Sequence, residues 1–476
     1  MLRSNVDVGK WLGWTCALAL LSFVSTGAHA QSLSDQIEIV EEDAANEGAA
    51  TESSEPQLDP EPIELAPREV PDYDGREPEG EGARGALWIP RLLLAPLYFV
   101  TEYVLRRPLR YLFSLGETSS KDPLRFFVFG NGRLAIVPTF LADFGNQPSA
   151  GIYVRWNDAG HENHRMRLHL ATWGKHWLKG RVTSRWENER FRGELRLSAL
   201  RRPDGLFARL GSAARPGLRT ARYQFRRLEA LASFEAHPWR ESVIEARVAL
   251  RELRFSNDAF RGPTVSDFVA NGDIDELPAG FEGYFIAEAR VSADLNSRQR
   301  EGNTSGFELR LAGGYAVDVR TPQERQWLSY AVNVAGHLDI GHRRVLSLSA
   351  TVQGTETLAG DVPFTELPEV GGSEALPGFR RDTLRGESTA SLVARYSWPI
   401  WVWLNATLHV GVGNAYDGRF ENMSLDNQRL GFGVGFSAVN NIDHIVNFIL
   451  AWGTDTFERG ASVDSFRLTI GATWRL

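Results

Sequence analysis

The sequence predicts an all-β protein: a 16-stranded antiparallel transmembrane β-barrel that follows a disordered acidic linker and a short N-terminal amphipathic helix. From about residue 133 onward, apolar and polar side chains alternate with a period of two. This pattern suits strands that have one face in lipid and the other in a wet interior. No apolar segment after Ala30 reaches the length of a membrane-spanning helix. A membrane protein of this composition must therefore close its backbone hydrogen bonds in a barrel.

Residues 1–30 have the pattern of a secretory signal peptide. Two basic residues precede an apolar run from Trp11 to Val24, and Ala28 to Ala30 has the A-x-A form of a cleavage site. The run is shorter than the about 20 residues of a spanning helix, which disfavours an uncleaved anchor. The single cysteine, Cys16, lies inside this run. We therefore expect the exported chain to contain neither disulfides nor thiol chemistry.

Residues 31–85 read as a disordered acidic linker. They contain 17 Asp and Glu, three Arg and six Pro, and such a segment buries too little apolar surface to offset the entropy of ordering it. Of the formal net charge of -8, the linker contributes -14 and the signal peptide +1, which leaves +5 for residues 86–476. The linker is either a solvated spacer or a tether that binds a periplasmic partner.

Residues 86–115 are rich in Leu, Tyr and Trp and are interrupted by Pro90, Pro96 and Pro108. We expect a short, kinked amphipathic helical segment on the inner surface of the outer membrane or in the barrel mouth, with its arginines toward anionic headgroups. The alternative is a helix packed on a soluble core.

The barrel is predicted over residues 130–476, and a soluble β-sandwich is the alternative that the same alternation allows. Long connections follow the fifth, seventh, eleventh, thirteenth and fifteenth strands, whereas those after the tenth, twelfth and fourteenth are short. If both barrel termini face the periplasm, every long connection is extracellular. The sixteen predicted strands are 133–143, 149–156, 164–173, 177–186, 190–198, 220–236, 242–256, 281–295, 304–320, 325–340, 343–356, 387–398, 402–415, 428–438, 443–453 and 464–476.

The connection at 357–386 and the strand after it carry the most specific motifs. The motif residues are Gly371, Gly372, Leu376, Pro377, Gly378, Phe379, Leu384, Arg385 and Gly386, followed by Arg395, Tyr396, Ser397, Trp398, Pro399 and Ile400. In order and spacing, this stretch resembles the BamA/TamA-like outer-membrane assembly superfamily, the bacterial surface antigen type of barrel. The resemblance is specific over residues 371–415, and the strand pattern extends it back to about residue 130.

That resemblance implies a sixth extracellular loop that folds into the barrel lumen, where a motif arginine pairs with carboxylates of the wall. Two positions depart from the family pattern: Pro377 replaces the loop arginine, and Arg395 replaces a strand glutamate. We therefore expect Phe379 and one of three arginines to lock the loop against the wall, with Asp382 or Glu387 as the partner of Arg395. The three loop candidates are Arg380, Arg381 and Arg385, and the wall candidates are Arg395 and Tyr396. The alternative is a mobile external loop with solvated arginines.

The C-terminal strand resembles the assembly signal of outer-membrane proteins. Thr469, Gly471, Trp474 and Leu476 supply its polar residue, its glycine and its two bulky apolar residues. Leu476 stands where the signal usually has an aromatic residue. An edge strand of this kind can add to the edge of another sheet. The alternative is an ordinary final strand.

The sequence contains no pattern that indicates catalysis, a cofactor, a metal site or nucleic-acid binding. His161 and His164 are expected in a turn, while His169, His337 and His409 face the lumen from three separate strands. The resemblance implies a non-enzymatic role in the Gram-negative outer membrane: to help insert or translocate proteins, or lipids. It implies outer-membrane lipids and client outer-membrane proteins as partners. The superfamily usually carries periplasmic POTRA domains before the barrel, but we expect none here, because no segment before residue 130 has their alternating helix and strand pattern. The alternatives are a passive pore or structural barrel and, with the weakest support, a lipase.

Overall fold

The computed structural model describes the barrel and part of the segment before it. The chain divides into two units, 1–71 and 72–476, and only the second contains described residues. The predicted signal peptide and acidic linker therefore lie outside the described residues. The described ranges are 95–99, 101–103, 107, 128–130, 132–143, 146–216, 220–258, 261–298, 305–341, 344–401, 404–439 and 444–474.

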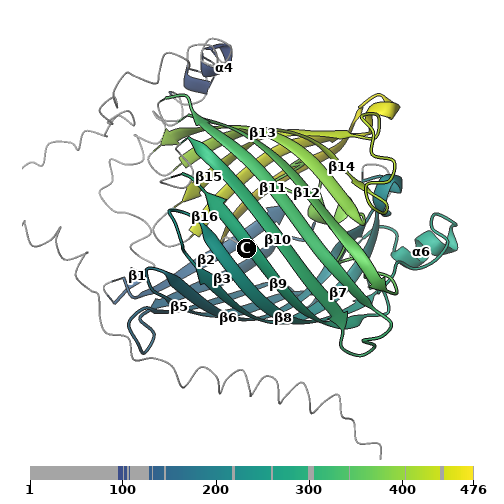
Figure 1. Cartoon of the computed structure of the whole chain (residues 1–476), viewed down its shortest axis with the longest axis horizontal. Helices are drawn as coiled ribbons and strands as arrows, with labels where there is room; N and C mark the ends of the chain where they lie inside the picture. The colour runs from purple at the N-terminus through teal and green to yellow at the C-terminus, as the bar shows by residue number, and fades with distance from the viewer. Residues whose placement is uncertain are drawn as a thin grey trace, which may run out of the picture. The chain divides into compact units, whose positions relative to one another are not determined.

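The described residues form a closed antiparallel barrel of sixteen strands, β2 to β17, with a two-residue strand β1 beside β2 (Figure 1). The predicted fold class is thus confirmed. The strands are β1 (Val128–Phe129), β2 (Leu134–Asp143), β3 (Ser149–Asn157), β4 (His164–Trp173), β5 (Trp177–Glu187), β6 (Phe191–Phe207), β7 (Ala221–Ala236), β8 (Val243–Ser256), β9 (Tyr284–Asn296), β10 (Gly306–Asp318), β11 (Gln326–Asp339), β12 (Val345–Ala359), β13 (Ser388–Trp401), β14 (Leu404–Tyr416), β15 (Arg429–Val439), β16 (His444–Thr454) and β17 (Val463–Trp474).

The ring closes where β17 pairs with β2, and we call this junction the seam. It spans four residue pairs, from Thr469 opposite Asp143 to Ala472 opposite Phe140. By contrast, β17 pairs with β16 from His444 opposite Trp474 to Thr454 opposite Val463. Because β3 occupies the other edge of β2, β1 pairs with the seam edge at Leu134 and Ala135. Among the described residues, no partner in β1 or β17 is present for residues 136–139 of that edge, and residues 475–476 after β17 are not described.

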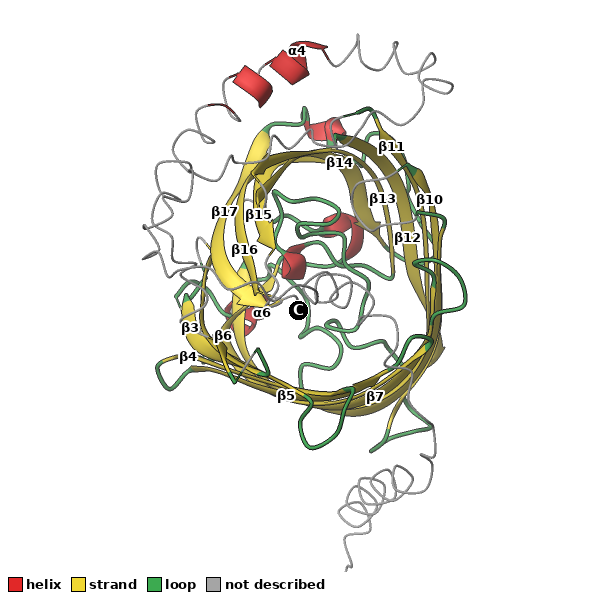
Figure 2. Ribbon diagram, turned by 90° about the vertical axis from the view of Figure 1, so that its left-hand side faces the viewer, coloured by secondary structure: helices red, strands yellow, loops and turns green. Residues whose placement is uncertain are grey.

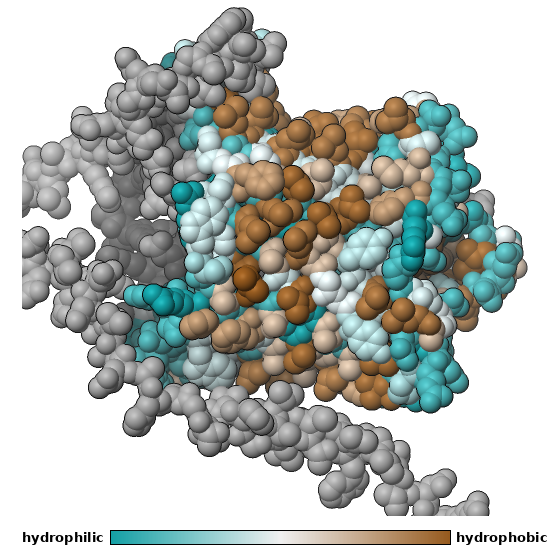
Figure 3. Space-filling view, in the orientation of Figure 1, coloured by the Kyte–Doolittle hydropathy of each residue, from teal (hydrophilic) through white to brown (hydrophobic). Residues whose placement is uncertain are grey.

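The strand residues alternate between an apolar outer face and a largely polar inner face. Exposed apolar side chains such as Leu197, Leu228 and Phe307 project outward, each at least half exposed. Figure 3 shows an apolar band across one side of the barrel with a hydrophilic edge beyond it. Burying this band in lipid removes a surface that would be unfavourable in water.

The connections after β6, β8, β12, β14 and β16 lie at the same end of the barrel, because successive strands are antiparallel. We call it the long-loop end, and the opposite end, where β2 begins and β17 ends, the terminus end. The helical turns α6 (Val265–Ala270), η4 (Gly211–Ala213), η5 (Arg381–Thr383) and η6 (Phe457–Arg459) belong to these long connections. None of the helices in the described part of the chain is long and apolar enough to cross a membrane.

Strand β6 is longer than predicted. The strand was expected to end at residue 198 and to be followed by a long connection. Instead it continues to Phe207, and a register shift between Arg202 and Gly205 accommodates the proline. The prediction failed because a bulge lets a strand pass a residue that cannot donate to the ladder.

Strand β13 also runs through a proline. The break predicted after Trp398 is a register shift between Pro399 and Trp401, and the strand ends at Trp401. His164 differs as well: it is the first residue of β4 and stacks on Trp186, with its Nε2 2.7 Å from Ser184 Oγ, rather than lying in a solvated turn.

The N-terminal segment contacts the outer wall near the terminus end. Of the predicted amphipathic segment, residues 86–115, the structure describes 95–99, 101–103 and 107, including helix α4 (Ala95–Phe99). Arg344, between β11 and β12, donates to Glu102 Oε2 at 2.7 Å and to the Tyr396 hydroxyl at 2.9 Å. Leu97 packs against a cluster that contains Tyr396 and Trp398. The outer face of β13 is therefore covered here by an earlier part of the chain.

Candidate functional site

The connection between β12 and β13, residues 360–387, enters the ring of strands, and we call it the motif loop. Figure 2 shows loop segments inside the ring when the barrel is viewed along its axis. Leu376, Phe379 and Leu384 are fully buried, although they belong to a connection. A hydrogen bond from the Gly372 N–H to the Phe379 carbonyl, at 2.9 Å, closes the tip of the loop into a compact turn. Gly372 has a φ of +106°, which a residue with a Cβ adopts only at a cost.

The tip of the motif loop, residues 374–379, lies directly on the inner face of β14 to β17. Gly411, Gly431, Gly453 and Ser465 are successive cross-strand neighbours there, and we call them the small-residue row. A Cβ on Gly411 would stand 2.4 Å from the Ala375 carbonyl oxygen, and one on Gly453 would stand 2.5 Å from the Phe379 ring. The three glycines of the row have no side chains, and the loop occupies the space that side chains would need.

Polar groups fix the tip at the edges of the small-residue row. The Ser465 hydroxyl donates to the Gly378 carbonyl at 2.7 Å, and His409 Nε2 donates to the Ala375 carbonyl at 2.8 Å. A Cβ on Gly378 itself would meet the main-chain carbon of Trp452 at 2.0 Å. The tip therefore fits the wall in one position, because main chain of the loop contacts main chain of the wall.

A second contact holds the motif loop to the opposite wall. Glu366 of the loop accepts from Arg251 of β8 at 2.5 Å and from the Tyr284 hydroxyl of β9 at 2.6 Å. Arg251 also binds Glu229 at 2.9 Å and Glu288 at 3.1 Å on the wall. At this contact the charges are the reverse of those expected, since a loop carboxylate meets a wall arginine. A buried arginine among three carboxylates is tolerated because each charge is paired.

Arg385 of the motif loop is buried but pairs within the loop. Its guanidinium lies 2.9 Å from Asp382 and 3.3 Å from Glu369. Burial alone would lower the pKa of Arg385, but the carboxylates of Asp382 and Glu369 and the nearby Tyr223 of β7 outweigh it and raise that pKa. Burial raises the pKa of Glu369, although Arg385 opposes this. Arg385 thus stabilises the fold of the loop instead of bridging it to a wall carboxylate.

The other loop candidates occupy different environments. Arg381 is exposed, whereas Pro377 is buried beside Leu376 in the tip. Arg380 is half-buried and lies near Asp143 of β2 and Asp204 of β6, whose charges act on its guanidinium. Of the remaining motif glycines, Gly371 stands against the Arg380 carbonyl and Gly386 against the Tyr416 main chain, where a Cβ would come within 2.4 Å of an oxygen.

The two wall candidates face opposite sides of β13. Arg395 faces the lumen and donates to the Glu374 main-chain carbonyl at 2.8 Å, not to Asp382 or Glu387 as expected. Tyr396 faces outward and binds Arg344 beneath the N-terminal segment. The structure therefore brings Arg395, but not Tyr396, to the motif loop.

The predicted C-terminal signal contributes to the seam. The Thr469 hydroxyl donates to Asp143 Oδ1 at 2.7 Å, and Arg467 Nε lies 3.2 Å from the same oxygen. Gly471 pairs with Leu141 across the seam. Trp474 is the last residue of β17, and Leu476 lies outside the described residues. The Asp143 carboxylate of β2 therefore binds two residues of β17 across the seam, and we call these three residues the latch.

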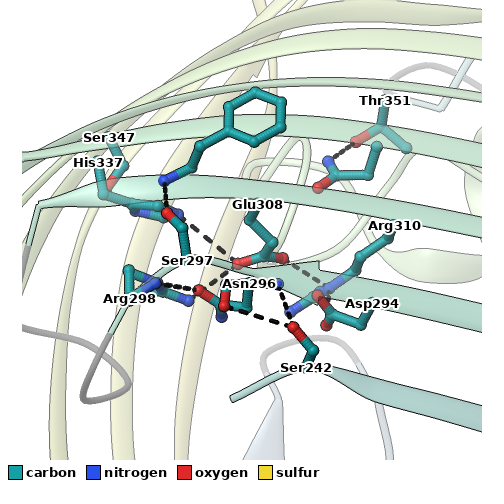
Figure 4. Close-up of polar contacts among 12 residues, drawn as sticks. Ser242, Asp294, Asn296, Ser297, Arg298, Glu308, Arg310, His337, Ser347 and Thr351 are labelled. Atoms are coloured by element: carbon teal, nitrogen blue, oxygen red, sulfur yellow. Dashed lines mark hydrogen bonds and ion pairs between the residues drawn. The ribbon is translucent and has the colours of Figure 1, made fainter. Parts of the chain in front are cut away.

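A polar network lines the lumen of β9 to β12 near the terminus end (Figure 4). The carboxylate of Glu308 lies 2.9 Å from Arg298, 2.6 Å from Arg310 and 3.6 Å from His337. His169 Nε2 lies 3.1 Å from the Thr139 hydroxyl, so the lumen histidines bind separate partners. Within the described residues, no three His, Cys, Asp or Glu side chains are grouped to hold a metal ion.

Aromatic side chains cover the lumen at the long-loop end. Phe364 of the motif loop lies 5.3 Å from the rings of Tyr223 and Phe255, measured between centroids. Phe207 and Phe281 belong to the same buried cluster. The motif loop is therefore part of the core that closes this end.

Sequence reasoning missed Arg251, Glu366 and Asp143. Arg251 and Asp143 occupy inward positions of alternating strands, so the period of two could have placed them in the lumen. Their partners come from distant segments, which periodicity does not reveal.

No protein-family model and no curated protein matches the sequence. Among solved structures, the barrel is similar to BamA from Haemophilus ducreyi lacking POTRA domains 1-3. The TM-score is 0.51, at 12% identity over 71% of this chain and 70% of that chain. CdiB from Acinetobacter baumannii (TM-score 0.46, 13% identity) and CdiB from Escherichia coli (0.49, 10%) are each matched by 71% of this chain. The chain spans 59% and 62% of those two.

The fold and the site define a sixteen-stranded barrel of the outer-membrane type with a loop inserted into its lumen. The likeness to BamA shows that the two barrels share a fold.

Proposed function

We propose that the protein is a non-enzymatic outer-membrane barrel that helps insert or translocate proteins, or lipids, through a seam that opens between β2 and β17. The observation that carries the proposal is the short seam: the described residues form four pairs between β17 and β2, against eleven between β17 and β16. Unpaired strand edges can add a further strand from another chain. A client strand would pair with this edge of β2 before it leaves into the membrane.

The motif loop supports the proposal because its tip rests on β14 to β17, which lead to the seam. Ser465 of β17 holds the tip by its Gly378 carbonyl. Asp143 connects β2 to β17 through Thr469 and Arg467. We propose that the loop keeps the β17 side rigid, so that opening requires only the latch and four ladder pairs to separate. The long-loop end then faces the cell exterior.

A disulfide across the seam tests this proposal. Leu141 and Gly471 are directly opposite, and neighbouring positions of an antiparallel ladder lie within reach of a disulfide. Cys16, in the predicted signal peptide, is the single natural cysteine. The Leu141→Cys, Gly471→Cys double variant is reconstituted in vesicles, and the folding of a urea-unfolded eight-stranded outer-membrane barrel is measured. We expect the reduced variant to accelerate the folding of this client barrel. Oxidation should abolish the acceleration, and a reductant should restore it.

The matched control is Ser349→Cys with Val393→Cys, an inward pair in register between β12 and β13. Oxidising this pair is expected to leave the folding assay unchanged. A seam disulfide without effect on folding would reject opening at this place. If, in addition, planar bilayers show steady currents that grow when residues 371–386 are removed, the protein is a passive pore.

A further inference from the structure

Three arginines form one row on the outer face of the wall at the long-loop end. Arg201 of β6 stands opposite Arg226 of β7, and Arg226 stands opposite Arg254 of β8. We call them the outer arginine row. Their side chains share the face of Leu197 and Leu228, which are 62% and 55% exposed, because residues two apart along a strand project to the same side. The row therefore lies at the edge of the apolar band.

The charge of this row is largely uncompensated. Glu252 binds Arg254 at 2.8 Å and Arg320 at 2.6 Å. Arg201 donates to Gln224, and its Nε, which is buried, has no hydrogen-bond partner among the residues that the structure describes. Among the described residues, Arg226 has no carboxylate partner. Four guanidinium groups thus share one carboxylate, and their repulsion is relieved best by an external anion.

The opposite edge of the same strands is built differently. At the terminus end of β6 and β7, Phe191 and Phe234 stack with their centroids 5.5 Å apart on the outer surface, and both rings are about half exposed. Aromatic rings of this kind are the usual boundary of the apolar band in outer-membrane barrels. Arginines at the other boundary of these strands therefore match a headgroup layer that carries negative charge.

A trough of about 520 Å³ lies on the outer wall directly on the membrane side of the outer arginine row. Its floor is low because Gly180 of β5 faces Ala199 of β6. Its apolar rims include Leu170, Leu228 and Leu250, and Glu252 and Phe285 line the end beside the arginines. An apolar trough below a cationic row has the polarity of a lipid, with the headgroup above and the acyl chain below.

We infer that the outer arginine row and this trough bind an anionic lipid of the leaflet at the long-loop end, one whose phosphate charge is not balanced by a cation in its own headgroup. Arg201, Arg226 and Arg254 take the phosphate oxygens, for which a guanidinium provides paired N–H donors. One acyl chain lies in the trough over Gly180 and Ala199. The site is on the opposite side of the wall from the motif loop, and it does not depend on the proposed opening of the seam.

Native mass spectrometry of the full chain in a neutral detergent tests this inference. The probes are a bis-phosphorylated, six-chain glucosamine disaccharide (lipid A) and phosphatidylcholine. We expect the wild-type protein to bind lipid A and to discriminate against phosphatidylcholine. The Arg201→Gln, Arg226→Gln, Arg254→Gln variant should bind lipid A at least about ten-fold more weakly, because three charge-assisted contacts are lost.

The matched control neutralises three exposed arginines at the terminus end, Arg133, Arg190 and Arg240, and should bind lipid A as the wild type does. Ala199→Trp fills the trough without changing charge and should weaken lipid A binding. Heat-modifiable mobility in electrophoresis reports whether each variant is folded.

Three outcomes would overturn the inference. Folded triple-glutamine protein that retains wild-type affinity would show that the row is not the site. Equal binding of phosphatidylcholine would show that phosphate recognition by charge is absent. Competition by free pyrophosphate, with no effect of Ala199→Trp, would show that a soluble anion and not a lipid is the ligand.

Discussion

The two halves of the inner wall hold the motif loop by different means. On β14 to β17, the small-residue row receives the loop backbone at distances that leave no room for a side chain. On β8 and β9, Arg251 and Tyr284 grip the Glu366 carboxylate through charge and hydrogen bonds. The first contact depends on shape and the second on charge neutralisation. The comparison shows that one loop in the lumen can be held in two ways. Its tip packs on a wall that lacks large side chains, and an ion pair binds another part of the loop to the opposite wall.

The largest expected effect comes from removing the positive charge of Arg251, which binds the motif loop to β8 and β9. Arg251→Met removes the guanidinium that Glu229, Glu288 and Glu366 share and leaves Glu288 with Arg247. Breaking a buried ion pair costs about 4 kcal/mol. The variant should expose the motif loop to protease and lower the temperature of the heat-modifiable transition. Arg310→Met is the control: its side chain is 53% exposed, so its loss should matter much less. Equal effects of the two variants would contradict the role given to Arg251.

The shape-dependent half is tested by Gly378→Ala. The added Cβ would stand 2.0 Å from main chain of Trp452, and overpacking of this kind costs about 3 kcal/mol. We expect the tip to leave its seat, which protection of residues 374–379 from hydrogen exchange would report. Gly435→Ala serves as the control, because the nearest atom to its added Cβ is a carbonyl oxygen 3.7 Å away. A tip equally protected in both variants would argue against main-chain seating.

The latch joins β2 to β17, and β17 is the last of the four strands that carry the small-residue row. Asp143→Ala removes the acceptor of Thr469 and the partner of Arg467, and losing bonds to a charged group costs about 2 kcal/mol. Exchange of the amides of residues 469–472 should accelerate, while β14 and β15 stay protected. Acceleration throughout the barrel would mean that the latch stabilises the whole fold and not the seam alone.

The smallest effect is a pH dependence at the long-loop end. Burial and the nearby carboxylates of Asp417, Glu421, Asp361 and Glu356 raise the pKa of Glu387 above its ordinary 4.5. A raised carboxyl pKa means that the folded state holds the proton more tightly, so its stabilising contribution is lost as the pH rises from 4.5 through the folded pKa. Thermal scans across this range should show a small decline that Glu387→Gln removes. An unchanged decline in the variant would assign it to another group.

The fold was largely accessible from the sequence, whereas the contacts of the site were not. The period of two placed the strands because lipid and lumen impose opposite polarity on alternate residues. Pro399 misled the prediction because bulges are set by neighbouring strands and not by local propensity. The motifs drew attention to the correct loop. They gave no indication that Arg385 pairs inside the loop or that Glu366 provides the contact with the wall.

The unequal lengths of the first and last strands have a further consequence. Before Thr469, β17 continues toward the long-loop end through residues 463–468, which have no β2 partner in the described part of the chain. At 3.3 Å per residue, this leaves a notch in the rim of about 20 Å, measured along the strand. A bilayer adjusts its thickness to a low rim. We expect the membrane to be thinnest at this notch, so that a polypeptide leaving the barrel would cross less hydrocarbon here than elsewhere around the circumference.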